Sequence, residues 1–121
     1  MKPDSYLKIA NRRIGPDDRT YFIADIAANH DGNLQRAVDL IHLAAEAGAD
    51  AAKFQHFTAD TIVSDFGFKA LQGQQSHQAK WKKTVFEVYK DASVDLGWTP
   101  TLKKACNEAG IAFFTSPYSE P

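Results

Sequence analysis

The sequence predicts an α/β fold in which short buried strands alternate with amphipathic helices. Three segments, residues 21–28, 51–55 and 111–115, are mostly apolar without strict alternation. This composition is typical of strands buried on both faces of a parallel sheet. Between these segments, apolar residues recur at helical spacing. Strands that alternate with helices in this way favour parallel βαβ units with right-handed crossovers.

The composition is that of an ordinary globular chain and excludes several classes of function. The 14 Lys and Arg residues are balanced by 15 Asp and Glu residues, which argues against a nucleic-acid-binding domain. No apolar run approaches the roughly 20 residues of a membrane helix, and the N-terminus lacks the apolar core of a secretory signal. GxGxxG, Walker A and GxSxG motifs are absent. We therefore expect a cytoplasmic protein that binds neither nucleic acid nor membrane.

The first 20 residues predict a β-hairpin that caps the rest of the chain. Residues 7–9 and 13–14 flank Asn11, and a polar turn follows at residues 15–18. The hairpin leads directly into the first strand of the expected sheet.

That first strand ends in a dense polar turn at residues 29–32. Asn33 is a suitable N-cap for a helix that runs to about Ala47, since an Asn side chain accepts a hydrogen bond from the first turn. The apolar residues of this segment fall on one helical face, and Gly48 provides a C-terminal stop. The second strand, at residues 51–55, follows.

The second half of the chain predicts two more helices and the third strand. A long irregular segment, residues 57–79, precedes a helix expected over residues 78–92. Thr99 suits the N-cap of the last helix, and the proline after it suits the first helical position. That helix ends at Gly110, and Cys106 on its apolar face is expected to be a small core residue. The single cysteine also excludes an internal disulfide.

This order of elements predicts the amino-terminal portion of a (β/α)₈ TIM barrel. Three parallel strands leave both edges of the sheet open, and a whole barrel needs about 250 residues. We therefore expect one partial domain over residues 1–121, with the hairpin at residues 1–20 and about three βα units at residues 21–121. With its edges open, such a chain is expected to self-associate.

Polar side chains gather at the carboxyl ends of all three predicted strands. Because ligands bind at this end of parallel α/β folds, these side chains form the candidate site. They are Asp25, Asn29, His30 and Asp31 for the first strand, Lys53, Gln55 and His56 for the second, and Thr115, Ser116 and Tyr118 for the third. The turn at residues 29–32 also has a purely structural explanation, since Asn and Asp favour turns for backbone reasons.

Lys53 is the most informative of these residues, because an ammonium group inside an apolar strand is costly to bury without a partner. An anionic ligand, such as a carboxylate or a phosphate, would supply that partner. Asp25 on the neighbouring strand could supply it instead, as a structural ion pair. Asp25 itself has two roles open, pairing for stability or contact with a substrate hydroxyl. His56, after the second strand, is equally divided between a structural and a functional role.

Three motifs together carry a resemblance to a known family. They are YFIADIAANHDG at residues 21–32, ADAAKFQH at residues 49–56 and GIAFFTSPY at residues 110–118. In order and spacing they resemble the first three strands of the N-acetylneuraminate (sialic acid) synthase family, and the likeness extends from about Leu7 to Tyr118. Such a match is more specific than any single short pattern.

The resemblance implies a longer enzyme, of which this chain is the amino-terminal piece. Family members carry a (β/α)₈ barrel and a small antifreeze-like domain, and they form dimers. They condense phosphoenolpyruvate with N-acetylmannosamine or a related N-acyl amino sugar, using Mn²⁺ or Mg²⁺, and release a nonulosonic acid and phosphate. The rest of the barrel, the antifreeze-like domain and the metal ligands are expected beyond residue 121. The isolated chain is therefore expected to be inactive.

The resemblance also implies roles for individual residues. Lys53 would contact phosphoenolpyruvate, in agreement with the electrostatic argument, and Ser116 would touch the same substrate. Gln55 would lie against the sugar. Asp25 would be catalytic near the sugar and the metal, although the family commonly has Glu there, whose side chain is longer by one methylene. Two other functions stay open: another phosphoenolpyruvate-dependent 3-deoxy sugar acid synthase, and a non-catalytic oligomerising fragment.

Overall fold

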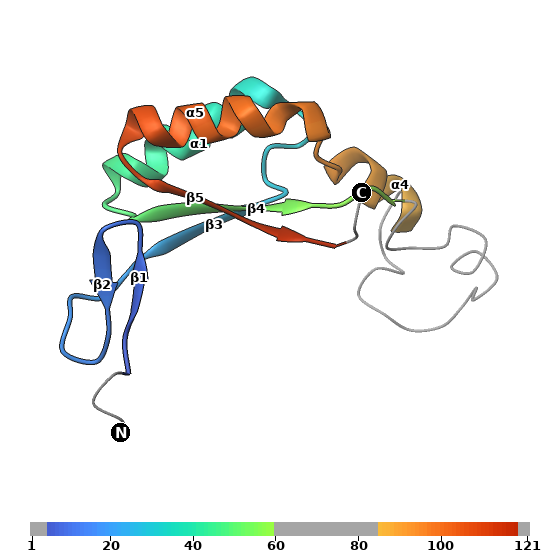
Figure 1. The fold of residues 1–121 in the computed structure, drawn as a ribbon. Helices are drawn as coiled ribbons and strands as arrows, with labels where there is room; N and C mark the ends of the chain where they lie inside the picture. The colour runs from blue at the N-terminus through green and yellow to red at the C-terminus, as the bar shows by residue number, and fades with distance from the viewer. Residues whose placement is uncertain (1–4, 60–84, 119–121) are drawn as a thin grey trace.

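The structure, a computed structural model, describes residues 5–59 and 85–118 of the chain (Figure 1). Its elements, in order, are β1 (Leu7–Ile9), β2 (Arg12–Ile14), β3 (Ile23–Ala27), α1 (Leu34–Glu46), β4 (Ala51–His56), α4 (Val85–Ala92), the 3-10 turn η2 (Leu96–Trp98), α5 (Thr99–Ala109) and β5 (Ala112–Pro117). Most of the long segment expected at residues 57–79, and the start of the helix expected from residue 78, lie outside the described residues.

The described strands form an antiparallel hairpin and a parallel three-stranded sheet. β1 pairs with β2 in the hairpin, and the sheet has the order β3-β4-β5. Asp25 of β3 lies opposite Lys53 of β4, and Gln55 of β4 lies opposite Ser116 of β5. The α/β class, the hairpin and the parallel sheet are confirmed.

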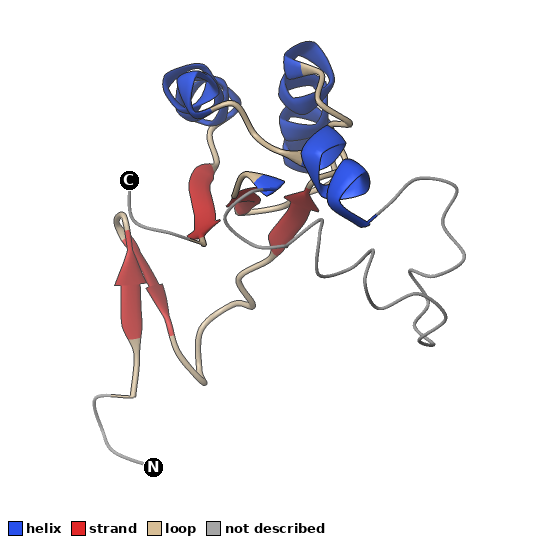
Figure 2. Ribbon diagram, turned by 90° about the vertical axis from the view of Figure 1, so that its right-hand side faces the viewer, coloured by secondary structure: helices blue, strands red, loops and turns tan. Residues whose placement is uncertain are grey.

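Helices α1 and α5 lie side by side on one face of the sheet (Figures 1 and 2). Figure 2 shows both helices on one side of the strands, with the hairpin on the other side. The core between helices and sheet is apolar, and burial of each large side chain in it contributes about 1.5–3 kcal/mol. It consists of Ile26, Ala37, Ile41, Ala52, Phe54, Leu102, Ala105 and Cys106. The core role predicted for Cys106 is confirmed.

The helix ends show where local sequence signals decide the structure and where they do not. The Asn33 side chain accepts a hydrogen bond from the backbone N–H of Arg36 at 3.0 Å, so the predicted N-cap of α1 is confirmed. Gly110 ends α5 with a left-handed φ of 77°, as predicted. The predicted start of α5 is wrong by one residue, because η2 runs directly into the helix and Trp98 takes the cap position. Thr99 is already helical.

Asp50 attaches the hairpin to the amino end of the sheet. Its carboxylate accepts a hydrogen bond from the backbone N–H of Phe22 at 2.8 Å and forms ion pairs with Arg12 and Arg19. Arg12 also donates to the backbone carbonyls of Arg19 and Thr20, each at 3.0 Å. The Phe22 hydrogen bond, together with the two guanidinium groups, lowers the pKa of Asp50. One carboxylate thus joins the segments before β3 and β4 to the hairpin.

Among the helices of the described residues, none has the length and apolar character needed to cross a membrane.

Candidate functional site

Four of the predicted site residues lie together on the face of the sheet that α1 and α5 do not cover. Side chains alternate along a strand, and Phe54 points into the helix-covered core, so Lys53 and Gln55 point to the opposite face. Residues in register share a face, which adds Asp25 beside Lys53 and Ser116 beside Gln55. We call this set, Asp25, Lys53, Gln55 and Ser116, the open-face cluster. The grouping expected at the carboxyl ends of the strands is therefore present.

Lys53 and Asp25 lie opposite each other without pairing. Lys53 is half-buried and Asp25 is exposed. No ion pair joins the two side chains within the described residues, where the ion pairs of Asp50, Asp18 and Asp31 are all present. The structural pairing that the sequence left open does not form. The Lys53 ammonium group has no carboxylate partner in the described part of the chain, which suits a cation that binds an anionic ligand.

A β-bulge ends β3 directly after Asp25. The register passes from Asp25 opposite Lys53 to Ala27 opposite Phe54, so Ile26 is the extra residue. Ile26 turns into the core with 6% of its surface exposed, and Ala27 adopts a left-handed φ of 51°. Bulges bend a strand and re-aim the residues beside it, and they recur next to active sites. The register with Lys53 already places Asp25 on the open face, and the bulge directly after it leads the chain into the turn that follows.

That turn uses Asn29 and His30 mainly for its own structure. The side-chain amide of Asn29 donates to the carbonyl of Ile26 at 2.9 Å. His30 is completely buried, its Nδ1 accepts the backbone N–H of Gly32 at 3.0 Å, and its ring meets Trp98 edge-on at 5.3 Å. Burial lowers the pKa of His30. The ring faces the interior and not the open face, and the substrate contact expected at His30 stays a prediction.

His56 lies on the covered face, with the opposite orientation to Gln55. Its Nε2 is 2.8 Å from the hydroxyl of Thr99, and its Nδ1 bonds the hydroxyl of Thr115. Burial lowers the pKa of His56. The sequence left this residue between two roles, and the structure places it in a hydrogen-bonded contact among β4, β5 and α5.

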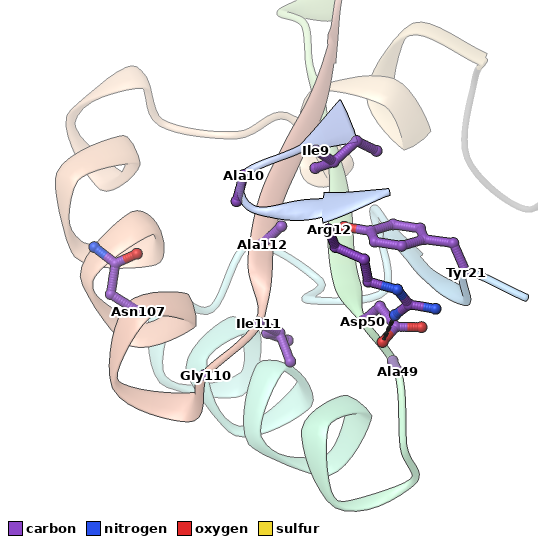
Figure 3. Close-up of a pocket in the computed structure, with 10 residues that line it drawn as sticks. All are labelled: Ile9, Ala10, Arg12, Tyr21, Ala49, Asp50, Asn107, Gly110, Ile111 and Ala112. Atoms are coloured by element: carbon purple, nitrogen blue, oxygen red, sulfur yellow. Dashed lines mark hydrogen bonds and ion pairs between the residues drawn. The ribbon is translucent and has the colours of Figure 1, made fainter. Parts of the chain in front are cut away.

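A cavity of about 430 Å³ lies at the other end of the sheet (Figure 3). Figure 3 shows Arg12 and Tyr21 beside Asp50, with Asn107 and Ile111 on the far wall. The two charged groups of this cavity already pair with each other. It therefore belongs to the hairpin attachment, at the amino end of the strands and away from the open-face cluster.

A second hollow lies next to the turn after β3. It has a volume of about 620 Å³ and is lined by Asp31 and Gly32 of the turn and by Val88, Asp91 and Ala92 of α4. Across residues 5–59 and 85–118, no three His, Cys, Asp or Glu side chains gather closely enough to hold a metal ion. The described residues thus offer a cation for an anion and polar groups for a sugar, but no metal-ligand set.

The fold defines an α/β protein whose parallel sheet carries a lysine and three polar side chains on the face that the helices leave open. Residues 40–121 match the NeuB family. The chain is 34% identical over 113 residues to the spore coat polysaccharide biosynthesis protein SpsE of Bacillus subtilis, covering 93% of this chain and 29% of that protein. It is 34% identical over 117 residues to the N,N'-diacetyllegionaminic acid synthase of Legionella pneumophila, covering 92% and 32%. The chain belongs to the NeuB family.

The fold is also similar to a solved structure, the N-acetylneuraminic acid (sialic acid) synthetase of Leptospira borgpetersenii serovar Hardjo-bovis. The TM-score is 0.72 at 25% identity, and the match covers 96% of this chain and 35% of that chain. The resemblance drawn from the three sequence motifs is confirmed. The chain spans about a third of the length of these relatives.

Proposed function

We propose that this chain is the substrate-binding amino-terminal part of a nonulosonic acid synthase with a (β/α)₈ barrel. The proposed reaction joins phosphoenolpyruvate to N-acetylmannosamine or a related N-acyl amino sugar and releases phosphate. The observation that carries the proposal is the open-face cluster, in which Lys53 lies among Asp25, Gln55 and Ser116 and forms no ion pair with any described residue. Membership of the NeuB family and the names of the relatives support the same reaction class.

Each residue of the cluster has a chemical part in this proposal. The Lys53 ammonium group pairs with the carboxylate or phosphate of phosphoenolpyruvate, and the Ser116 hydroxyl donates a hydrogen bond to the same anion. Gln55 offers an amide donor and an acceptor to sugar hydroxyls. Asp25 accepts a hydrogen bond from a sugar hydroxyl beside the reacting carbons. C3 of phosphoenolpyruvate then attacks the sugar aldehyde, water adds at C2, and phosphate leaves.

The metal of the proposed enzyme, Mn²⁺ or Mg²⁺, does not fit the described residues. Asp25 is the acidic member of the open-face cluster, and no group of three possible ligands occurs within residues 5–59 and 85–118. A divalent ion needs several oxygen or nitrogen ligands. Its ligands are proposed to lie beyond residue 121, and the steps above do not depend on it. The proposed enzyme is a homodimer.

Binding of phosphoenolpyruvate to the 121-residue chain tests the proposal. Titration of the isotope-labelled chain is expected to shift the amide NMR signals of Lys53, Gln55 and Ser116. Lys53→Ala should weaken binding by about tenfold or more, because a charge-assisted hydrogen bond is lost. Lys8→Ala, which removes an exposed lysine of β1, is the matched control and should bind as the wild type does. Equal binding by Lys53→Ala, or no shift in a cooperatively folded chain, would contradict the proposal.

Turnover is a separate measurement. Phosphate release from phosphoenolpyruvate, N-acetylmannosamine and Mn²⁺ is not expected from the 121-residue chain, since the metal ligands are proposed to lie outside it. Release that disappears in Lys53→Ala would show that the chain assembles a complete site by itself. That result would keep the reaction and overturn the proposed place of the metal ligands.

A further inference from the structure

His56 connects three elements at the carboxyl end of the sheet. Its Nε2 lies 2.8 Å from Oγ1 of Thr99, the first residue of α5, and its Nδ1 bonds Oγ1 of Thr115 in β5. The backbone carbonyl of His56 accepts the N–H of Tyr118 at 3.1 Å, directly after β5. One residue of β4 therefore holds both the end of the neighbouring strand and the beginning of the helix that leads into it.

The bonded residues are chain neighbours of two members of the open-face cluster. His56 follows Gln55, Thr115 precedes Ser116, and Gln55 and Ser116 are register partners. Side chains alternate along a strand, so the histidine contacts lie on the covered face directly behind the two cluster residues. A contact that fixes the backbone of both strands on one face also fixes the separation of the side chains on the other.

The surroundings of His56 favour one arrangement of the ring. The ring is half-buried and meets Phe113 edge-on, with the ring centres 6.4 Å apart. Each ring nitrogen faces a hydroxyl group, and a hydroxyl can donate or accept, so a neutral ring has both nitrogens satisfied in either tautomer. Burial lowers the pKa of His56 and so favours the neutral ring.

We propose that His56 is a positioning residue that sets the separation of Gln55 and Ser116 through Thr99 and Thr115. The identity of the ligands rests on the proposed function, which assigns phosphoenolpyruvate to Ser116 and the sugar to Gln55. The part of the inference that concerns the strand ends depends only on the hydrogen bonds of His56 to Thr99 and Thr115. His56 itself touches no substrate.

Amide hydrogen exchange of the 121-residue chain tests the hold on the strand ends. His56→Phe keeps an aromatic ring beside Phe113 and removes both hydrogen bonds, and Thr99→Val removes one hydroxyl at constant size. Thr99→Val should speed exchange at Ser116 and Tyr118 by about fivefold, the effect of losing one net hydrogen bond, and His56→Phe, which loses two, should speed it further. Exchange in β3 should be unchanged. His56→Gln, which keeps a donor and an acceptor, should restore much of the protection.

Phosphoenolpyruvate affinity supplies the readout that general stability does not affect. His56→Phe and Thr99→Val should weaken binding by about threefold to fivefold through the displaced Ser116, and His56→Gln should recover most of it. Faster exchange throughout the sheet, or local fraying at unchanged affinity, overturns the positioning role. If the wild-type chain binds no phosphoenolpyruvate, the proposed function fails, and the exchange rates decide whether His56 holds the two strand ends.

Discussion

Asp25 and Lys53 lie opposite each other on adjacent parallel strands, and no ion pair joins them within the described residues. Adjacent opposite charges on one sheet face commonly pair, and exposed pairs of this kind contribute little stability. The open arrangement leaves the two groups available for separate partners. We therefore expect Lys53 to raise the affinity for an anionic ligand and Asp25 to lower it.

The first prediction separates these two charges. Asp25→Asn should tighten phosphoenolpyruvate binding by about twofold to threefold, because it removes a negative charge next to the bound anion. It should change the free energy of unfolding by less than about 0.5 kcal/mol, since the carboxylate is exposed and makes no ion pair with Lys53. Calorimetric titration and a urea melt measure the two quantities. A large loss of stability would instead show that the pair is structural.

The second prediction concerns the pH dependence of the hairpin attachment. The backbone N–H of Phe22, with Arg12 and Arg19, holds the pKa of Asp50 below its ordinary value of 3.8. The unfolded chain therefore binds this proton more readily, and the contribution of Asp50 is complete above about pH 4 and is lost as the pH falls through the lowered pKa. Asp50→Asn should remove this part of the acid sensitivity and loosen β1 and β2.

Melts between about pH 2 and pH 7, with NMR signals of β1 and β2 as local probes, measure this effect. Asp17→Asn is the matched control, because Asp17 is exposed in the turn after β2. That substitution should leave the acid profile of the hairpin close to that of the wild type. An unchanged profile in Asp50→Asn would rule out Asp50 as the group that attaches the hairpin.

Much of the fold could be predicted because its signals are local in the sequence. The Asn33 cap, the Gly110 stop and the apolar periodicity of the helices each involve residues within one or two turns. The start of α5 could not be placed in this way. Thr99 has the side chain of a cap residue, but its hydroxyl bonds His56, which lies 43 residues away in the sequence. A tertiary hydrogen bond thus overrides a local preference.

The candidate site shows the same division. The open-face cluster follows from strand alternation, and the positions of Lys53, Gln55 and Ser116 could therefore be predicted. The direction of His30 depends on Trp98, which is distant in the sequence, and a polar turn alone gives no sign of it. Asp50 was missed as a structural residue. The sequence does indicate this role: Asp50 is a single carboxylate directly before an apolar strand, and the preceding hairpin carries arginines with which it can pair.

The third prediction is a loss of stability as the pH falls below about 6.5. Burial lowers the pKa of His30 from 6.5, although Asp31 opposes this effect, so the unfolded chain binds a proton that the folded chain does not. Stability is therefore complete above about pH 6.5 and falls as the pH drops towards the folded pKa. His30→Asn should reduce this pH dependence while costing about 2 kcal/mol in lost packing against Trp98.

Stability measured at about pH 7 and pH 5.5 gives the comparison. His56 contributes in the same direction, since burial lowers its pKa as well, so part of the dependence should persist in His30→Asn. His42→Asn replaces an exposed histidine of α1 and should keep the wild-type difference between the two pH values. Equal pH dependence in His30→Asn and the wild type would argue against a neutral, buried His30.

The last prediction concerns the bulge next to Asp25. Ala27 has a left-handed φ of 51°. In this region the Cβ atom comes too close to the backbone, a strain that glycine avoids because it has no Cβ. Ala27→Gly should therefore stabilise the chain by about 0.5–1 kcal/mol, measured as the midpoint of a urea melt. Ala24→Gly, in the regular part of β3, should destabilise it by a similar amount, because glycine there only adds freedom to the unfolded chain. Destabilisation by both substitutions would mean that Ala27 is not left-handed and that no bulge re-aims the strand beside Asp25.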